Sequence, residues 1–120
     1  MNVDSNEKVD RPWGYYINLY GDNNSGYRVK KIVVNVKGKL SLQSHDHRVE
    51  HWIIVKGEGR VIVGENCFSV GKGIHIYIPK KALHRIENIG EEDLELIETQ
   101  IGDYLGEDDI IRYEDIYNRI

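Results

Sequence analysis

Short runs rich in β-branched and aromatic residues alternate with turn-forming segments over most of the chain. The runs cover residues 15–20, 27–36, 52–55, 60–63, 67–70, 74–78, 84–88 and 94–100. Glycine-rich or charged segments separate them, for example Gly64-Glu65-Asn66 and Gly71-Lys72-Gly73. Many short strands at near-regular spacing are typical of a sandwich or barrel, so the pattern predicts an all-β fold and disfavours a helix-rich one.

The two ends of the chain depart from this pattern. Residues 1–10 are polar and lack periodicity, which predicts a flexible N-terminal lead-in or an edge-pairing arm. Residues 11–120 are then expected to form a single domain. Near the other end, Asp109 has an N-capping side chain and residues 110–117 have mixed helical spacing, so we expect a short helix or turn there.

Composition and charge narrow the functional classes. A chain of 120 residues is expected to form one domain with a modest core. The formal net charge of -4 provides no basic field for holding nucleic acid. The single cysteine, Cys67, rules out an internal disulfide framework, and no apolar stretch has the length of a signal sequence or a membrane span. We therefore expect a cytoplasmic protein without nucleic-acid or membrane partners.

The densest group of potential metal ligands lies in residues 38–52. Side chains alternate along a strand, so His45 and His47 leave the same face and can reach one ion. If the chain reverses at the next two residues, Glu50 lies across from His47 and adds a carboxylate. His51 falls on the opposite face by the same parity. Because the two corner residues, Arg and Val, do not suit a tight turn, His51 stays a reserve ligand.

A third histidine, His84, follows in a later predicted strand. Three imidazoles and a carboxylate would suit a divalent metal ion, namely Zn, Mn, Fe, Co or Ni, and would leave coordination positions open for a substrate. The spacing alone does not choose among these metals. His75 has no such neighbours in the sequence, so it is interpreted as structural or exposed.

The spacing of these residues resembles the two motifs of the cupin superfamily. The first consists of Gly38, six residues, His45, one residue, His47, two residues, Glu50, six residues and Gly57. The second consists of Gly73, five residues, Pro79, then His84, three intervening residues and Asn88, with Lys81 where that pattern commonly has Gly. The resemblance implies a cupin double-stranded β-helix, a jelly-roll barrel, in which His45, His47, Glu50 and His84 hold one metal ion. The Glu-to-Gly spacing favours Glu50 over His51.

The resemblance narrows to the type II mannose-6-phosphate isomerase domain and covers roughly residues 11–119. The segments that carry it are 11–14, 41–52, 77–79, 84–88 and 102–110. In that family the domain often forms the C-terminal part of a bifunctional protein with a mannose-1-phosphate guanylyltransferase, and we expect no nucleotidyl transfer by this chain. The resemblance also implies a homodimer and a role in carbohydrate metabolism, including polysaccharide biosynthesis.

The activity that the resemblance implies is interconversion of mannose 6-phosphate and fructose 6-phosphate. Moving a proton between C2 and C1 requires a base near both carbons and an electrophile that stabilises the developing oxyanion. A divalent metal would supply the electrophile, and the candidate bases are His51, Lys31, Glu98 and a metal-bound hydroxide. Gln43 shares the strand parity of the ligands and could bind the metal or a sugar hydroxyl.

The phosphate group of such a substrate calls for Arg or Lys side chains. The available residues are Arg11, Lys30, Lys31, Arg48, Arg85 and Arg112. Arg48 and Arg85 are favoured because each is adjacent to a predicted ligand. Strand parity, however, turns Arg85 away from the face of His84 unless the strand is bulged.

Two other functions remain open at this point. A nucleotide-sugar epimerase-like cupin would also need a proton-abstracting base but usually no metal, and the intact ligand set argues against it. A non-catalytic cupin would bind metal and sugar without turnover. Trp13, Trp52 and Tyr77 are interpreted as core or pocket-wall residues, and the acidic run at 107–109 is interpreted as a solvated cap.

Overall fold

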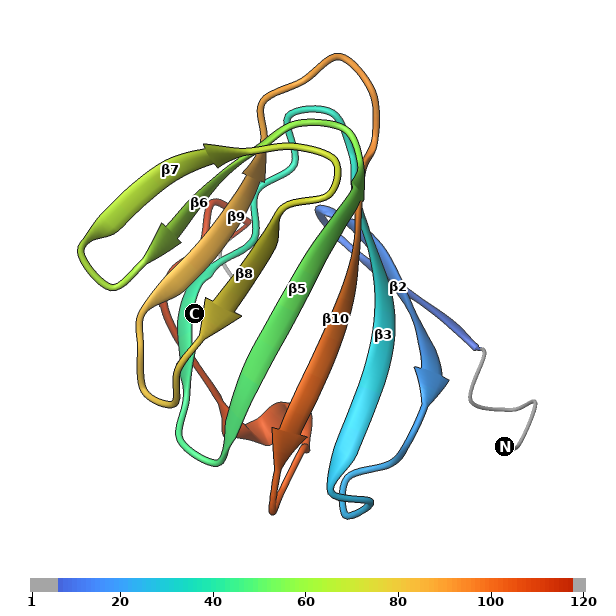
Figure 1. Ribbon diagram of the computed structural model, residues 1–120. Coiled ribbons are helices and arrows are strands. Elements are labelled where there is room, and N and C mark those ends of the chain that lie inside the picture. Colours follow the sequence, from blue (N-terminus) through green and yellow to red (C-terminus); the bar gives the residue numbers. More distant parts are fainter. Residues whose placement is uncertain (1–6, 118–120) are drawn as a thin grey trace.

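The structure, a computed structural model, describes residues 7–117, which form two antiparallel β-sheets packed face to face (Figure 1). The first sheet has the strand order β1-β2-β3-β10-β5-β8, and the second has the order β11-β4-β9-β6-β7. The first sheet contains β1 (Lys8–Arg11), β2 (Gly14–Tyr20), β3 (Tyr27–Val34), β10 (Leu94–Gly102), β5 (Arg48–Lys56) and β8 (His75–Ile78). The second contains β11 (Ile110–Glu114), β4 (Leu42–His45), β9 (His84–Asn88), β6 (Gly59–Val63) and β7 (Asn66–Val70). From β3 onward the chain crosses repeatedly between the two sheets, as in a double-stranded β-helix.

This architecture confirms the all-β fold expected from the sequence. Each predicted run overlaps an observed strand, and the strand over 84–88 has the predicted bounds. Helical structure within the described part of the chain is a single 3-10 turn, η2 (Glu107–Asp109). Among residues 7–117, no helix has the length and apolarity needed to cross a membrane.

The C-terminal segment contains a helical turn, but this turn lies at Glu107–Asp109, before residues 110–117, where a short helix or turn was predicted. Residues Ile110–Glu114 form β11, and Ile110 lies opposite His45 of β4. Asp109 therefore does not cap a following helix. Its carboxylate instead accepts hydrogen bonds from the backbone N–H groups of Asp46 and His47. Tertiary pairing of the β-branched residues with β4 has overridden a weak local helical pattern.

The N-terminal segment forms an edge strand. Lys8–Arg11 pairs antiparallel with β2 at the end of the first sheet, which matches the edge-pairing alternative for the last residues of the predicted lead-in. The first six residues of that lead-in lie outside the described residues.

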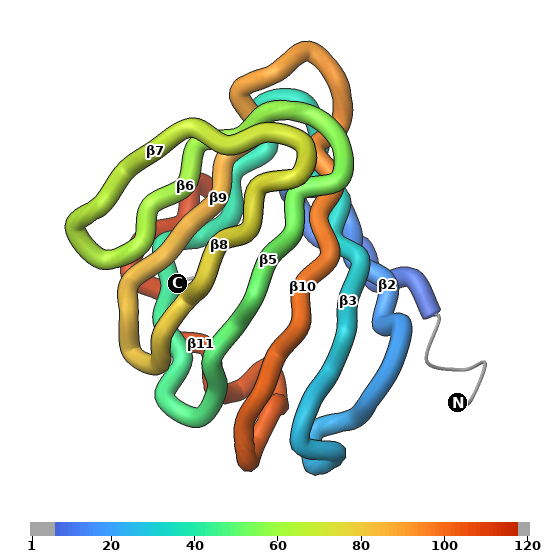
Figure 2. The backbone as a smooth tube through the Cα atoms, viewed as in Figure 1, coloured from blue at the N-terminus to red at the C-terminus, as the bar shows by residue number. Residues whose placement is uncertain are grey.

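The space between the sheets holds both the apolar core and a group of polar side chains. The core contains Trp13, Ile32, Val34, Leu40, Trp52, Ile54, Val61, Val70, Ile76, Ile78, Ile86, Leu94 and Leu96. Four buried ionisable residues, His45, Glu50, His84 and Glu98, come from β4, β5, β9 and β10. The corner between β4 and β5 lies beside η2 at the lower end of the barrel in the backbone trace (Figure 2). The barrel thus brings polar residues far apart in the sequence to one end.

Candidate functional site

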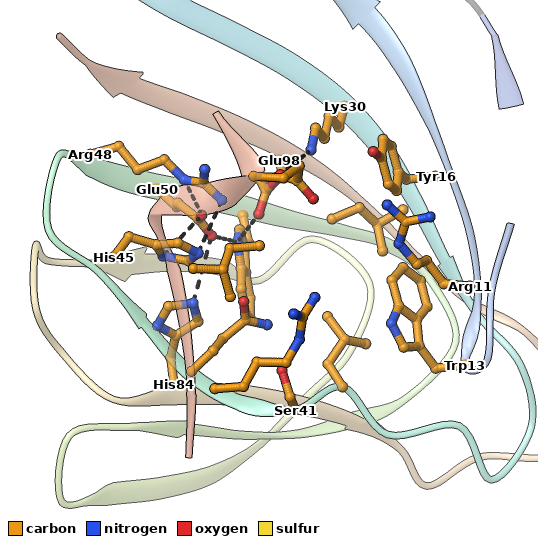
Figure 3. Close-up of a pocket in the computed structure, with 17 residues that line it drawn as sticks. Arg11, Trp13, Tyr16, Lys30, Ser41, His45, Arg48, Glu50, His84 and Glu98 are labelled. Atoms are coloured by element: carbon orange, nitrogen blue, oxygen red, sulfur yellow. Dashed lines mark hydrogen bonds and ion pairs between the residues drawn. The ribbon is translucent and has the colours of Figure 1, made fainter. Parts of the chain in front are cut away.

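A pocket between the two sheets collects charged side chains from both of them (Figure 3). His45, Glu50 and His84 lie at one side of this pocket, whereas Arg11 and Lys30 lie at the other. Other residues that line it include Tyr16, Gln43, Arg48, Trp52, Glu98, Glu107 and Arg112. The pocket is therefore polarised, with potential metal ligands at one side and cationic side chains facing them.

The potential ligands form a compact cluster. Oε2 of Glu50 lies 3.4 Å from Nδ1 of His45, and Oε1 of Glu50 lies 3.9 Å from Nε2 of His84. One donor atom from each residue can be chosen such that all lie within 4.8 Å of one another. All three side chains are buried. Two imidazoles and a carboxylate match the donor set of a catalytic metal site that keeps positions open for substrate.

Strand register and a backbone carbonyl orient these ligands. Gln43 lies opposite His84 in the β4–β9 pair, and it shares a face with His45 because the two are separated by one residue. Nδ1 of His84 lies 3.0 Å from the carbonyl oxygen of Ala82. A ring N–H that donates there leaves Nε2 of His84 directed at Glu50 as a free ligand atom.

Arg48 packs against the cluster and sets its protonation. Its Nε donates to Oε2 of Glu50 at 2.8 Å, and its Nη2 donates to Nε2 of His45 at 3.0 Å. Burial alone would raise the pKa of Glu50, but the Arg48 guanidinium lowers that pKa to about 2. Burial lowers the pKa of His45 to about 3, and Arg48 contributes to this shift. At neutral pH the cluster thus contains a carboxylate and a neutral imidazole, the forms that bind metal ions.

A second carboxylate, Glu98, lies beside the cluster, and its pKa is shifted in the opposite direction from that of Glu50. Burial raises the pKa of Glu98 to about 7, and the neighbouring Glu50 carboxylate contributes to this rise. The indole N–H of Trp52 donates to Oε1 of Glu98 at 3.1 Å, and Nε2 of Gln100 donates to Oε2 at 2.9 Å. Glu98 is therefore held firmly in the pocket and can exchange a proton near neutral pH.

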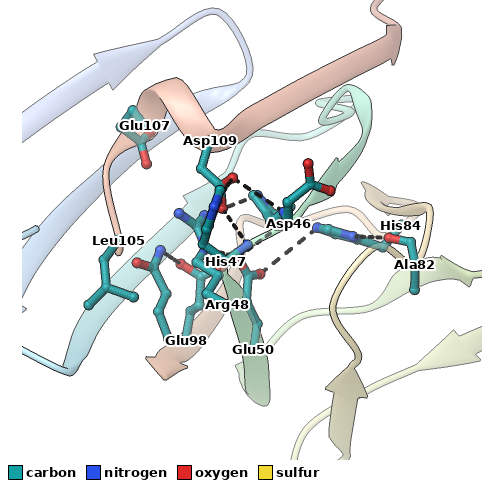
Figure 4. Close-up of polar contacts among 12 residues, drawn as sticks. Asp46, His47, Arg48, Glu50, Ala82, His84, Glu98, Leu105, Glu107 and Asp109 are labelled. Atoms are coloured by element: carbon teal, nitrogen blue, oxygen red, sulfur yellow. Dashed lines mark hydrogen bonds and ion pairs between the residues drawn. The ribbon is translucent and has the colours of Figure 1, made fainter. Parts of the chain in front are cut away.

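His47, the fourth predicted ligand, lies outside the cluster (Figure 4). Strand alternation does not reach His47, because β4 ends at His45 and His47 belongs to the corner before β5. Nδ1 of His47 lies 2.6 Å from Oδ1 of Asp109, and the side chain is 58% exposed. His47 therefore joins the corner to η2, apart from the three clustered residues, and its role as a fourth ligand stays a prediction.

Cationic residues face the cluster across the pocket. Nζ of Lys30 lies 3.2 Å from Oε2 of Glu107 and 4.1 Å from the ring centre of Tyr16. Cζ of Arg11 lies 5.3 Å from the same ring centre. Arg112 of β11 also lines the pocket. The structure thus places Arg11, Lys30 and Arg112 where an anionic group could reach them.

Two predicted bases face away from the pocket. His51 follows Glu50 in β5 and points to the outer face, where its Nδ1 lies 3.0 Å from Nε2 of His75. Lys31 follows Lys30 in β3, and its Nζ lies 2.9 Å from a carboxylate oxygen of Glu95. Strand alternation therefore removes both from the set of pocket bases and leaves Glu98 as the candidate that lines the pocket.

Arg85, one of the favoured phosphate contacts, also lies outside the pocket lining. Its Nε donates to the carbonyl oxygen of Leu40 at 2.9 Å, and its Nη1 donates to Glu114 at 2.9 Å. The parity of β9 explains this placement, because His84 faces the pocket and its neighbour faces the other way. Arg85 instead ties β9 to β11.

Several residues that hold the site in place were not predicted from the sequence. The shared donor of the carboxylates is Trp52, and Gln100 holds Glu98 in place. Gln100 lies two residues after Glu98, so strand alternation could have placed both on the same face. By contrast, Glu107 and Asp109 were interpreted as a solvated cap, and no local pattern indicates their contacts with Lys30 and His47.

The residues present fit one divalent metal ion. Three ligands, His45, Glu50 and His84, converge in a buried polar site, and the low pKa of Glu50 keeps a negative charge there. Gln43, two residues before His45 in β4, lines the same pocket. Imidazole and carboxylate ligands are compatible with Zn, Mn, Fe, Co or Ni, so this donor set does not select among them.

The barrel and its buried ligand cluster define the chain as a cupin, a protein with a double-stranded β-helix. An uncharacterised Klebsiella pneumoniae protein with such a domain superposes with a TM-score of 0.75 and 15% identity, covering 96% of both chains. Lactobacillus farciminis oxalate decarboxylase gives a TM-score of 0.75 and 20% identity, covering 91% of this chain and 34% of that one. Both comparisons show the fold.

Within this class, the chain belongs to the family described as "Mannose-6-phosphate isomerase C-terminal", whose sequence profile matches residues 1–115. It is 48% identical over 112 residues to the xanthan biosynthesis protein XanB of Xanthomonas campestris, covering 93% of this chain and 24% of that protein. The mannose-1-phosphate guanylyltransferase ManC of Salmonella typhimurium is 44% identical over 113 residues, with 94% and 23% covered. The chain therefore spans about a quarter of the length of the curated relatives it matches.

Proposed function

We propose that this chain is a metal-dependent isomerase that interconverts mannose 6-phosphate and fructose 6-phosphate. The observation that carries the proposal is the pair formed by Glu50 and Glu98. Their pKa values are pushed apart, to about 2 and about 7, beside two buried imidazoles. One carboxylate is thereby suited to metal binding and the other to proton transfer. Membership of the isomerase family supports this assignment.

The proposed roles follow from the chemistry of an aldose-ketose isomerisation. A divalent ion held by His45, Glu50 and His84 would supply a Lewis acid for the carbonyl and hydroxyl oxygens. Glu98 takes the proton from C2 of the aldose and delivers it to C1, so that the net change is a proton shift along the carbon chain with a matching shift between the two oxygens. Burial of Glu98 raises its pKa above the ordinary value, which favours a carboxyl group that can both accept and return a proton.

The remaining pocket residues bind and orient the substrate. Nη1 of Arg48 and Oε1 of Gln100 have no hydrogen-bond partner among the described residues, although both are buried. In this proposal Nη1 of Arg48 donates to a sugar oxygen, and Gln43 binds a hydroxyl group. Lys30 and Arg11, at the opposite side of the pocket, bind the phosphate group.

The alternative is a non-catalytic cupin that binds a metal ion and a sugar phosphate. A homodimer and a cytoplasmic location remain predictions as well, and sedimentation of the purified protein tests the former.

A coupled assay with mannose 6-phosphate tests the proposal. Metal-loaded protein is expected to form fructose 6-phosphate, and chelation is expected to abolish this activity. Glu98→Gln should lower kcat by at least about 100-fold, because it removes the proton carrier. Lys30→Gln should raise KM, whereas the matched control Lys31→Gln, on the outer face, should leave both constants unchanged. Sugar-phosphate binding without turnover under any divalent metal would establish the binding module instead.

A further inference from the structure

We propose that His51 and His75 form a second metal site, a surface chelate for a borderline transition-metal ion on the outer face of the first sheet. Nδ1 of His51 lies 3.0 Å from Nε2 of His75. The two rings are nearly parallel, with an interplanar angle of 11° and centres 5.2 Å apart. This pair is separate from the pocket, because His51 and Glu50 project from opposite faces of β5.

The backbone fixes the spacing of the two histidines. His51 lies opposite Tyr77 in the β5–β8 pair, and His75 lies opposite Ile53. His51 and His75 are therefore diagonal neighbours on one face of two hydrogen-bonded strands, a separation that long side chains span. The ring of Tyr77 lies 5.0 Å from that of His51 and flanks the pair. Neither imidazole has to move its backbone to reach a shared ion.

The nitrogen separation suits an ion held by two imidazoles. Metal–nitrogen bonds of about 2.0–2.1 Å, at angles of about 90–109°, place two donor nitrogens about 2.9–3.4 Å apart. The observed 3.0 Å falls in this range. In the metal-free pair one ring N–H donates to the other ring, so that binding requires the donor ring to transfer its proton to its other nitrogen. Exchange with solvent permits this, because His75 is exposed. Each ring must also turn by roughly 40° from the line that joins the two nitrogens to direct its lone pair at the ion, a change that side-chain torsions can make.

The surroundings favour an ion that prefers nitrogen ligands. Among the described residues, no carboxylate or thiol joins the pair in a cluster of potential ligands, and an aromatic ring flanks it. Imidazole nitrogen suits Cu²⁺, Ni²⁺ and Zn²⁺, with Cu²⁺ bound most tightly. Water or a ligand from another molecule would fill the remaining positions. This site does not depend on the proposed isomerase activity.

Copper titration of the tag-free full chain tests the proposal by electron paramagnetic resonance. In a His45→Ala plus His84→Ala variant, we expect one equivalent of Cu²⁺ with hyperfine coupling to two imidazole nitrogens. Adding His75→Ala should weaken that binding at least 10-fold. Adding His47→Ala instead should leave that binding unchanged, because His47 lies at the corner beside η2 and not in the outer pair. His47 is a matched control because it is also an exposed histidine.

A second measurement covers the case in which the background variant does not fold. At limiting free Cu²⁺, where a site weakened 10-fold stays largely empty, wild-type protein should bind about one more equivalent of nitrogen-coordinated Cu²⁺ than His75→Ala does. Equal copper stoichiometry in these two proteins would overturn the proposal, as would coupling to a single nitrogen. A loss of outer-site binding on His47→Ala, matching that of His75→Ala, would also overturn it.

Discussion

Glu50 and Glu98 share one hydrogen-bond donor: the indole N–H of Trp52 lies 3.0 Å from Oε1 of Glu50 and 3.1 Å from Oε1 of Glu98. Two adjacent buried carboxylates resist simultaneous ionisation, so their titrations are coupled. Arg48 bonds to Glu50 and favours its ionised form, and the proton is then retained by Glu98. The position of one guanidinium, beside Glu50, thus assigns different chemical roles to two identical side chains that share an indole donor.

Trp52→Phe should reveal the contribution of that shared donor. The variant removes the N–H from two buried acceptors, and we expect the free energy of unfolding to fall by about 1–3 kcal/mol more than in Trp13→Phe. Trp13 is a suitable control because it is also a buried core tryptophan, so both changes leave a similar cavity. Urea denaturation provides the measurement. Equal losses in the two variants would mean that the indole N–H does not stabilise the pair.

The raised pKa of Glu98 predicts a pH-dependent stability for the metal-free protein. The folded-state pKa of about 7 exceeds the ordinary value of 4.5, so the folded state binds this proton more tightly. The resulting contribution is fully present below about pH 4.5 and is lost as pH rises through 7. Relative to Glu98→Gln, the wild type should therefore lose on the order of 3 kcal/mol of unfolding free energy between pH 4.5 and 7.5. Denaturation of both proteins in the presence of a chelator measures this difference, and a pH-independent difference would contradict it.

Metal binding should distinguish His45 from His47, although one residue separates them. In protein that carries His75→Ala, which removes the outer pair, added Zn²⁺ or Co²⁺ should raise the melting temperature because it binds the folded state. His45→Ala should abolish this rise, whereas His47→Ala should retain it. Differential scanning fluorimetry with and without metal tests both variants. Equal loss in the two would restore His47 to the ligand set.

Lys81→Gly should stabilise the turn before β9. Lys81 has a φ of 68°, in the left-handed region where a side chain is unfavourable, and its backbone N–H donates to the carbonyl oxygen of His45 at 2.7 Å. We expect the free energy of unfolding to rise by about 0.5–1 kcal/mol, because the strain removed exceeds the added entropy of glycine. Lys81→Ala keeps the Cβ atom and should bring no such gain. Chemical denaturation compares the variants.

Gly102→Ala should disturb the corner that carries His47. A Cβ atom at residue 102 would lie 2.9 Å from Cα of Arg48 and even closer to the carbonyl oxygen of His47, so β10 and the corner would have to separate. A loss of more than about 2 kcal/mol in the free energy of unfolding is expected. Gly90→Ala is the control, since its Cβ atom would meet neighbours at ordinary distances of 3.5 Å or more. A Gly102→Ala variant as stable as Gly90→Ala would show that the contact relaxes at no cost.

Local pattern was sufficient for most strands of this fold, and it failed for β11 and elsewhere that tertiary contacts decide the structure. Alternation along β5 correctly separates Glu50 from His51, and alternation along β9 correctly turns Arg85 away from His84. The same rule does not extend to His47, because β4 ends at His45. A sequence pattern gives the parity within a strand but not the residue at which the strand ends.

The electrostatic roles in the pocket required three-dimensional information. Lys30 and Lys31 are equivalent candidates in the sequence, and only the packing of β3 shows that Lys30 reaches Glu107 while Lys31 pairs with Glu95. The acidic turn at η2 contacts residues more than 60 positions away, for example Asp109 with His47. Such contacts arise from the order of strands in the sheets, which no local window contains.

The pocket has the opposite charge to the protein around it. Its lining includes four cationic side chains, Arg11, Lys30, Arg48 and Arg112, against three carboxylates, Glu50, Glu98 and Glu107, whereas the chain as a whole carries a net charge of -4. The excess negative charge therefore lies on the remaining surface, and an anion is attracted only when it reaches the mouth of the pocket. Attraction over so short a distance is screened little by salt. Anionic ligands should therefore be bound with an affinity that depends weakly on ionic strength, unlike those that follow an extended basic surface.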